Sequence, residues 1–218
     1  MGNKISAVIL AAGLSSRMGQ PKMLLPWGKT TVLGQVLSTF TAARLEEIVV
    51  VTGGSRQQIE QLVKEFPQAV PVRTVFNPLY AHGEMLSSIQ AGLRSLLPFP
   101  PLQDSSTQSK GFGAGREGVA AALIGLGDQP QVLEATVRRI CAAFEHTHSS
   151  LVIPSFQGRR GHPWLVAPPL WPEILALPAS TTPRQFLNAH ASQVEYVDAD
   201  QTILQDLDTP EEYARQRP

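Results

Sequence analysis

A short apolar run that leads directly into a glycine-containing loop constrains the fold of this chain more than any other feature. Residues 5–10 read ISAVIL, the composition of a buried β-strand, and the loop at 11–22 contains Gly13, Arg17 and Lys22. Backbone N–H groups in such a loop can point at phosphate oxygens, and the two cations would neutralise the phosphate charge. The segment therefore predicts an anion-binding loop at the end of a strand in a parallel sheet.

Apolar runs then alternate with helical periodicity along the chain. A helical pattern at 32–43 precedes a buried strand at 47–52, and a helix capped by Ser55 continues to about 66, before a strand at 70–76. The same patterns predict, in order, a helix at 86–97, a strand at 119–126, a helix at 132–144, a strand at 151–153, an extended segment at 164–166 and helices at 171–177 and 184–191. Strands that alternate with helices through short turns pair in parallel through right-handed crossovers. The predicted fold class is α/β, a single-domain, three-layer α/β/α, Rossmann-like arrangement with a doubly wound, mostly parallel sheet.

The composition fits one domain spanning residues 1–218 and excludes several classes of partner. Segment 98–118 is rich in proline, glycine and small polar residues, so we expect an exposed, partly disordered insertion. The formal net charge is +0, which gives no electrostatic case for nucleic acid or an anionic membrane. No apolar run approaches the ~18 residues of a membrane span, and the N-terminus lacks a signal-peptide apolar region. The single cysteine, Cys141, excludes an internal disulfide, fits a cytoplasmic protein and is expected to pack as a core thiol.

One acidic residue follows a predicted central strand directly. Asp128 lies in the sequence Gly127-Asp128-Gln129-Pro130, just after the apolar run at 119–126. Ligands of open α/β sheets bind at the carboxyl ends of the strands, and an aspartate there is a suitable oxygen ligand for Mg²⁺. The alternative is an ordinary cap of the following helix.

A second acidic cluster precedes the C-terminal helix. Thr209, Pro210 and Glu212 form a complete helix-capping sequence, with proline at the first helical position. Capping leaves Asp206 and Asp208 unexplained, and both lie on one side of an extended segment because side chains alternate with a period of two.

Two familiar phosphate loops do not fit the first segment. A dinucleotide fingerprint requires G-x-G-x-x-G and an immediate helix, but only Gly13 and Gly19 are present and the helical pattern starts near Thr31. A Walker A loop requires G-x-x-x-x-G-K-[ST]; Gly28-Lys29-Thr30 matches its end, yet Met23 stands where the first glycine is needed.

A third kind of loop matches densely. Residues 10–26 resemble the pattern L-A-A-G-x-S-x-R-M-G-x-x-K-x-L-L-P of the molybdenum-cofactor cytidylyltransferase branch of the nucleoside-triphosphate transferase superfamily. The matching positions are Leu10, Ala11, Ala12, Gly13, Ser15, Arg17, Met18, Gly19, Lys22, Leu24, Leu25 and Pro26. The resemblance extends in register to Tyr213, with the insertion outside it, and includes G-D-Q-P at 127–130 and D-L-D-T-P-E-E-Y at 206–213.

The resemblance implies roles for particular residues. It implies that Leu10, Ala11, Ala12, Gly13, Ser15, Arg17 and Lys22 bind the nucleotide, with Gly53, Ser87, Ser88 and Gly92 bordering its base and ribose. Glu84 interrupts the family's G-M-x-x-S segment here, which puts the base contacts in question. Asp128 and Asp208 are expected to hold Mg²⁺, with Asp208 preferred over Asp206. Arg17, Lys22 and Asp128 would carry the catalysis. His162, in a G-H-P element, would bind the acceptor or satisfy a turn carbonyl.

The reaction implied is transfer of CMP from CTP to the phosphate of a molybdopterin-type cofactor, with release of pyrophosphate. Ala11-Ala12-Gly13, rather than Ala-Gly-Gly, favours the cytidylyl branch over its guanylyl relatives. A target molybdoenzyme is a further expected partner. Two alternatives remain open: the same chemistry on a sugar or polyol phosphate, and a non-catalytic nucleotide- or cofactor-binding accessory protein for molybdoenzyme maturation.

Overall fold

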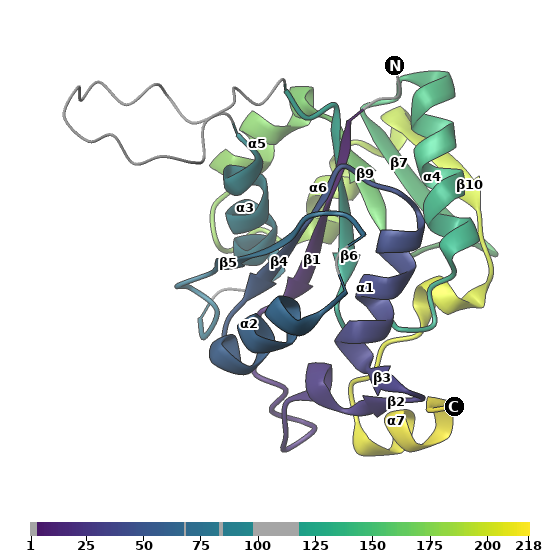
Figure 1. The fold of residues 1–218 in the computed structure, drawn as a ribbon. Helices are drawn as coiled ribbons and strands as arrows, with labels where there is room; N and C mark the ends of the chain where they lie inside the picture. Colours follow the sequence, from purple (N-terminus) through teal and green to yellow (C-terminus); the bar gives the residue numbers. More distant parts are fainter. Residues whose placement is uncertain (1–3, 68, 83–84, 98–117) are drawn as a thin grey trace.

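The computed structural model describes residues 4–67, 69–82, 85–97 and 118–218 (Figure 1). The predicted insertion, apart from its last residue, and Glu84 lie outside these residues. The strands are β1 (Ile5–Ala11), β2 (Pro26–Trp27), β3 (Thr30–Thr31), β4 (Glu47–Thr52), β5 (Val72–Phe76), β6 (Ala121–Leu126), β7 (Leu151–Phe156), β8 (Arg159–Arg160), β9 (Trp164–Val166) and β10 (Val194–Asp198). The α-helices are α1 (Val32–Ala42), α2 (Arg56–Glu65), α3 (Met85–Leu96), α4 (Glu134–Thr147), α5 (Trp171–Ala176), α6 (Pro183–Ala189) and α7 (Pro210–Gln216).

The main sheet has the strand order β10-β7-β9-β6-β1-β4-β5, with β8 paired to β7. Strand β1 pairs in parallel with β4 and with β6, β4 pairs in parallel with β5, and β10 pairs in parallel with β7. Strand β9 is antiparallel to both β6 and β7. The single-domain, mostly parallel α/β/α prediction is confirmed. The antiparallel insertion of β9 was not predicted, because a three-residue extended segment carries no information on pairing direction.

Helices cover both faces of the sheet (Figure 1). Side chains of β1 alternate between the faces: Ala7 and Ile9 pack with α1, α2 and α4, whereas Val8 and Leu10 pack with α3, α5 and α6. Ile9 and Val8 are fully buried, and burial of such a side chain contributes about 1.5–3 kcal/mol. The central strand is therefore apolar at every position except Ser6, because neither face meets solvent.

The chain reverses direction across the sheet at β1. It proceeds from β1 outward to β4 and β5, and α3 then returns it to β6 on the opposite side of β1. The carboxyl ends of β1 and β6 are thus the topological switch point, where the connecting loops diverge and open α/β sheets bind ligands. Both loops singled out in the sequence, after Ala11 and after Leu126, begin there.

A small apolar cluster attaches the C-terminal segment to this edge. Met18, Leu25, Trp27 and Leu207 are buried in it together with Val32. Tyr213 of α7 packs against the cluster, and its hydroxyl donates to the Pro26 carbonyl at 2.6 Å. The predicted capping sequence of α7 is confirmed, since Thr209 and Glu212 exchange reciprocal hydrogen bonds. The cluster fixes α7, and with it the preceding acidic residues, beside the β1 loop.

Two other sequence predictions have mixed outcomes. Ser55 precedes α2, as expected, but its side chain makes no capping hydrogen bond, so the cap prediction is wrong. Cys141 packs against the core from a half-buried position on α4, and burial, with the nearby Glu145 charge, raises the pKa of its thiol to about 12. In the part of the chain that the structure describes, no helix has the length and apolarity needed to cross a membrane.

Candidate active site

The loop after β1 is closed by its own hydrogen bonds. Ser15 adopts a φ of 54°, its carbonyl accepts from the Met18 N–H at 2.9 Å, and its hydroxyl accepts from the Lys22 N–H at 3.1 Å. Gly19 has a φ of 66°, in the left-handed region that glycine occupies without steric cost. These contacts fold the loop back so that Lys22 returns to the carboxyl end of β1. Ser15 therefore shapes the loop in this structure.

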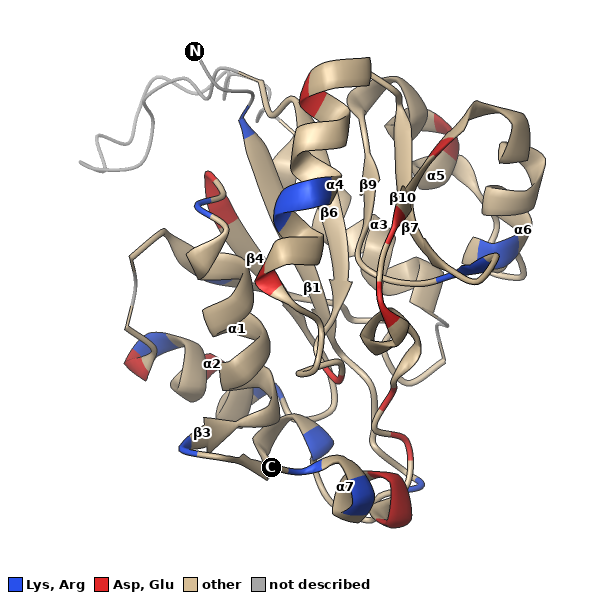
Figure 2. Ribbon diagram, turned by 90° about the vertical axis from the view of Figure 1, so that its right-hand side faces the viewer, with Lys and Arg blue, Asp and Glu red and all other residues tan. Residues whose placement is uncertain are grey.

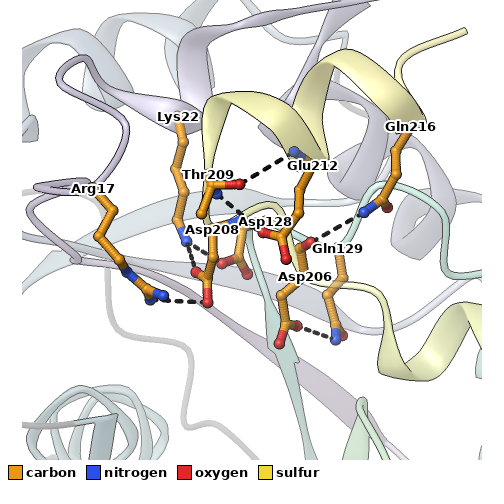
Figure 3. A network of polar contacts seen from close by, with 9 residues as sticks. All are labelled: Arg17, Lys22, Asp128, Gln129, Asp206, Asp208, Thr209, Glu212 and Gln216. Carbon is orange, nitrogen blue, oxygen red and sulfur yellow. Dashed lines mark hydrogen bonds and ion pairs between the residues drawn. The ribbon is translucent and has the colours of Figure 1, made fainter.

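Four charged side chains from three remote segments converge at the switch point (Figure 3). The Lys22 ammonium contacts Asp128 Oδ2 and lies 3.0 Å from Asp208 Oδ1. Arg17 Nη2 lies 2.9 Å from the other oxygen of Asp208. Lys22 and Asp128 are only 11% and 14% exposed, whereas Arg17 is 69% exposed. The charged residues predicted from separate motifs are thus one continuous ion-pair network.

The network favours the charged forms of Lys22 and Asp208. Burial disfavours the Lys22 ammonium, but the carboxylates of Asp128 and Asp208 outweigh burial and raise its pKa. Burial also disfavours the Asp208 carboxylate, yet hydrogen bonds and charge from Lys22, with the charge of Arg17, lower its pKa. Two cations and two carboxylates in contact can exchange partners, so the cations can accept an anionic ligand when the carboxylates accept a divalent cation.

The structure distinguishes the two aspartates that the sequence left open. Asp206 faces Gln129, whose Nε2 donates to Asp206 Oδ1 at 2.7 Å, and burial together with the Asp128 charge raises the Asp206 pKa. Asp208 instead faces the cations, and the Glu212 carboxylate accepts from its N–H at 2.9 Å (Figure 3). Asp208, and not Asp206, forms an ion pair with the loop cations.

Asp128 and Asp208 have a donor set that fits a divalent cation. Both carboxylates flank the same cation, the Lys22 ammonium, which stands in for positive charge between them. Within the described residues there is no group of three or more histidine, cysteine, aspartate or glutamate side chains arranged for a metal ion. Mg²⁺ usually takes only one or two protein carboxylates and completes its octahedral coordination with substrate phosphates and waters, so a two-carboxylate site suits it.

A cavity of about 220 Å³ opens beside the network. It is lined by Leu10, Ala12, Gly13, Lys22, Met23, Tyr80, Met85, Ser88, Leu126 and Asp128. Six of the residues named in the sequence therefore border one space at the carboxyl ends of β1 and β6. Met23, Tyr80 and Leu126 were missed, because each carries an ordinary apolar or aromatic side chain without a motif of its own.

Other predicted nucleotide-binding residues do not line this cavity. Ala11 is buried in the opposite core, and Gly53 abuts the Ala12 carbonyl, where a Cβ would come within 2.2 Å. Ser87 is buried, and its hydroxyl accepts from Asn77 Nδ2 at 2.9 Å. Gly92 is buried where α3 crosses the sheet, and a Cβ there would lie 2.2 Å from Val8 Cγ1. Gly92 allows close packing of α3 on the sheet and does not line this cavity, and its contact with a nucleotide stays a prediction.

His162 lies at a second, larger cavity of about 970 Å³. Its peptide bond to Pro163 is cis, and its Nε2 atom is buried with no partner among the described residues. Burial of the ring lowers the pKa of His162 to about 4, so the imidazole is neutral at physiological pH. The predicted alternative of a satisfied turn contact therefore does not hold for Nε2. His162 is not part of the Lys22 network.

An open α/β sheet with a cation–carboxylate network at its switch point fits a nucleotidyltransferase, and sequence comparison shows that class. The pattern of the MobA-like NTP transferase domain matches residues 7–194, and the chain belongs to that family. Its sequence identity to individual proteins is moderate.

Three relatives illustrate that likeness. The Escherichia coli (strain K12) molybdenum cofactor cytidylyltransferase is 29% identical over 96% of this chain and 93% of its own length. Nicotine blue oxidoreductase of Paenarthrobacter nicotinovorans is 28% identical over 97% of this chain and 95% of its own. A probable molybdenum cofactor guanylyltransferase of Bacillus cereus (strain ATCC 10987 / NRS 248) is 33% identical over 42% of each chain.

Solved structures share the whole fold. A nucleotidyl transferase from Methanothermobacter thermautotroptrophicus superposes with a TM-score of 0.73 at 26% identity, covering 99% of this chain and 97% of its own. The Mycobacterium tuberculosis H37Rv protein Rv0371C, solved in complex with manganese, superposes with a TM-score of 0.72 at 23% identity, covering 99% and 98%. The second likeness concerns the fold alone.

Proposed function

We propose that this protein transfers CMP from CTP to the phosphate of a molybdopterin-type cofactor and releases pyrophosphate, with Mg²⁺ as cofactor. The observation that carries the proposal is the contact of Lys22 and Arg17 with Asp128 and Asp208 at the switch point. A binding protein for an anion needs the cations alone, whereas a metal-assisted transfer needs both signs of charge at one place. The Escherichia coli relative supports the choice of acceptor.

In the proposed reaction, Arg17 and Lys22 exchange their carboxylate partners for oxygens of the triphosphate. An oxygen of the acceptor phosphate attacks the α-phosphorus in line, a new P–O bond forms, and the bond from the α-phosphorus to the bridging oxygen breaks. Pyrophosphate leaves with the electron pair of that bond. Lys22 and Arg17 stabilise the charge that accumulates on the leaving group, so no protein nucleophile is required.

Asp128 and Asp208 would hold the divalent cation. When bound, the metal neutralises charge on the phosphoryl oxygens and orients the triphosphate. Glu212 keeps Asp208 in place through the N–H groups of Asp208 and Thr209, at 2.9 and 3.0 Å. Because two carboxylates alone make a weak Mg²⁺ site, we expect metal and nucleotide to bind together.

The nucleotide would enter the 220 Å³ cavity, where Leu10, Ala12, Gly13 and Ser88 form the walls. The Ala11-Ala12-Gly13 sequence favours CTP over GTP through its resemblance to the cytidylyl branch. A sugar or polyol phosphate as acceptor is the main alternative, since the same charged network would serve that reaction.

Two other possibilities differ in chemistry. The oxidoreductase name of the Paenarthrobacter relative would require a redox cofactor, but the loop lacks the G-x-G-x-x-G sequence of a dinucleotide site. A non-catalytic accessory protein would not require two carboxylates beside the anion-binding cations. We propose a cytoplasmic location, because a reducing environment suits the free thiol of Cys141. The product would then pass to a target molybdoenzyme.

The test is pyrophosphate release by the purified protein with CTP, GTP, ATP or UTP, in the presence and absence of molybdopterin. We expect release that requires Mg²⁺, CTP and molybdopterin together, with the cytidylylated product identified by mass spectrometry. If pyrophosphate were released with a sugar phosphate but not with molybdopterin, the acceptor would be a sugar phosphate and the protein would still be a nucleotidyltransferase. Binding of CTP without turnover on either acceptor would contradict the transferase proposal.

A further inference from the structure

The larger cavity adjoins the candidate nucleotide cavity. Met85, the first residue of α3, lines both spaces, so it forms a shared wall between them. The larger cavity is bordered by β7, the β8 hairpin, β9, β10 and α6, and it contains about 970 Å³, ample for a ligand larger than a nucleotide base. A ligand in it would reach the phosphate-handling network past Met85.

The lining of this cavity carries positive charge without compensating acid. Arg159, Arg160 and Arg184 all border it, and no aspartate or glutamate does among the described residues. None of these arginines forms an ion pair with a described residue, unlike Arg17 at the nucleotide site. Three unneutralised guanidinium groups around one hollow produce a positive potential that attracts an anionic ligand. Figure 2 shows the blue segment of α6 near β7 and β10.

Arg160 is held in a fixed orientation by neutral partners. Its Nε donates to the Tyr196 hydroxyl at 2.8 Å, and its Nη1 donates to Asn188 Oδ1 at 2.9 Å. The guanidinium also lies 5.7 Å from the centre of the Tyr196 ring. Its Nη2 group has no acceptor among the described residues. A guanidinium that is already oriented and retains N–H donors loses little freedom when it binds an oxyanion, and it can do so bidentately.

His162 complements this charge as a neutral group. His162 lines the same cavity, its buried Nε2 has no partner among the described residues, and its ring lies beside Trp164 with centroids 6.3 Å apart. Because the low pKa keeps the imidazole uncharged, His162 can offer a hydrogen bond but cannot supply the anion-binding charge. That charge comes from the arginines, so the acceptor contact predicted for His162 would be a neutral one.

We propose that Arg160, supported by Arg159 and Arg184, binds an anionic part of the acceptor that lies away from its reacting phosphate. The inference rests on the proposed function, because it assumes that the reacting phosphate sits at Lys22 and Asp128. It narrows the acceptor class: the substrate carries at least two negatively charged groups, one at each cavity. A polyol monophosphate has no anionic group besides its reacting phosphate, so it would bind weakly to this protein.

A heavy oxyanion tests the site without knowledge of the acceptor. We expect crystals soaked in tungstate to show an anomalous peak within hydrogen-bonding distance of Arg160, and titration calorimetry to detect the same binding. Arg160→Ala should remove that peak and weaken this binding about 10- to 100-fold, with Arg160→Lys intermediate, because the lysine keeps the charge without the planar fork. Tyr196→Phe removes the hydroxyl that accepts from Arg160 Nε, and it should weaken tungstate binding less than Arg160→Ala does. Lys64→Ala, on the exposed face of α2, removes a positive charge elsewhere and should change nothing.

Kinetics connect the site to the reaction. Arg160→Ala should raise the acceptor KM about tenfold or more while the KM for CTP and the CTP-induced thermal shift stay as in the wild type. No tungstate peak in the cavity, or equal affinity in Arg160→Ala, would refute the inference whatever the acceptor is. Failure of the wild type to transfer CMP would refute the proposed function, and the tungstate result would still decide the anion site.

Discussion

Replacing Asp208 or Asp206 with asparagine, one at a time, distinguishes the roles of these two residues. Asp208 contacts Lys22 at 3.0 Å and Arg17 at 2.9 Å, whereas Asp206 contacts Gln129 at 2.7 Å. Asparagine keeps the size of the side chain and removes the charge that a divalent cation needs. We expect Asp208→Asn to lower turnover about 10²- to 10³-fold, or about 3–4 kcal/mol of barrier. Asp206→Asn should stay within about threefold, because an amide oxygen still accepts the Gln129 hydrogen bond.

The loss of stability in Asp208→Asn is expected to be small. Its pair with Arg17 is largely solvent-exposed and contributes at most about 1 kcal/mol. Its pair with Lys22 is more buried, but Lys22 keeps Asp128 as a partner, so the uncompensated charge costs about 1 kcal/mol more. A total of about 1–2 kcal/mol corresponds to a melting temperature lowered by about 2–8 °C for a chain of this size. Unfolding therefore cannot account for the lost turnover at 25 °C.

Both variants are measured beside the wild type in two assays. Pyrophosphate release at saturating CTP, Mg²⁺ and molybdopterin gives the turnover, and thermal unfolding followed by circular dichroism gives the stability. A nucleotide titration by thermal shift adds a readout that needs no acceptor: CTP with Mg²⁺ should stabilise the wild type and Asp206→Asn but not Asp208→Asn. Asp208→Asn with near-wild-type turnover, or equal losses in the two variants, would refute this assignment.

Three further predictions concern residues outside the charged network. Gly92→Ala places a Cβ 2.2 Å from Val8 Cγ1 and should cost about 1–3 kcal/mol in urea unfolding; unchanged stability would contradict the close packing of α3. The folded pKa of His162, about 4 against 6.5 unfolded, means that its stabilising contribution is complete above pH 6.5 and lost as pH falls toward 4. The free energy of unfolding in urea should therefore fall between pH 7 and 4.5 by about 2 kcal/mol more in the wild type than in His162→Gln, and equal pH dependence in the two proteins would exclude that burial effect. The raised pKa of Cys141 should make its reaction with a thiol reagent at pH 8 at least about 100-fold slower in the folded than in the urea-unfolded protein, and equal rates would be inconsistent with it.

Local patterns were sufficient to predict most of the elements. The apolar run at 5–10 became β1, and the periodic apolar positions became α1 and α4 with shifts of a few residues at their ends. The capping sequence around Thr209 predicted the start of α7 because its hydrogen bonds join residues three apart. Ser55 failed as a cap for the opposite reason: a suitable residue type leaves the side-chain orientation free, and tertiary packing decides it.

Some residues of the candidate site could likewise be predicted from the sequence, and others could not. Arg17, Lys22, Asp128 and Asp208 were named from residue type and motif, and the structure joins them in one network. The choice between Asp206 and Asp208 needed the structure, because both have the same chemistry and lie on an extended segment whose neighbours come from distant parts of the chain. Gly92 was named from its motif, and only the structure shows that α3 crosses β1 so closely that a Cβ there would meet Val8.

The sequence by itself determined an α/β chain with an anion-binding loop and carboxylates at strand ends, because strands, helices and caps follow from residues close together in the chain. The tertiary structure alone decided which of those charges meet, and it brought Arg160, Asn188 and Tyr196 together from β8, α6 and β10 around a second cavity. Contacts of this kind depend on how three remote elements pack. No local pattern records that packing, and ion pairs and hydrogen bonds act over only a few ångströms.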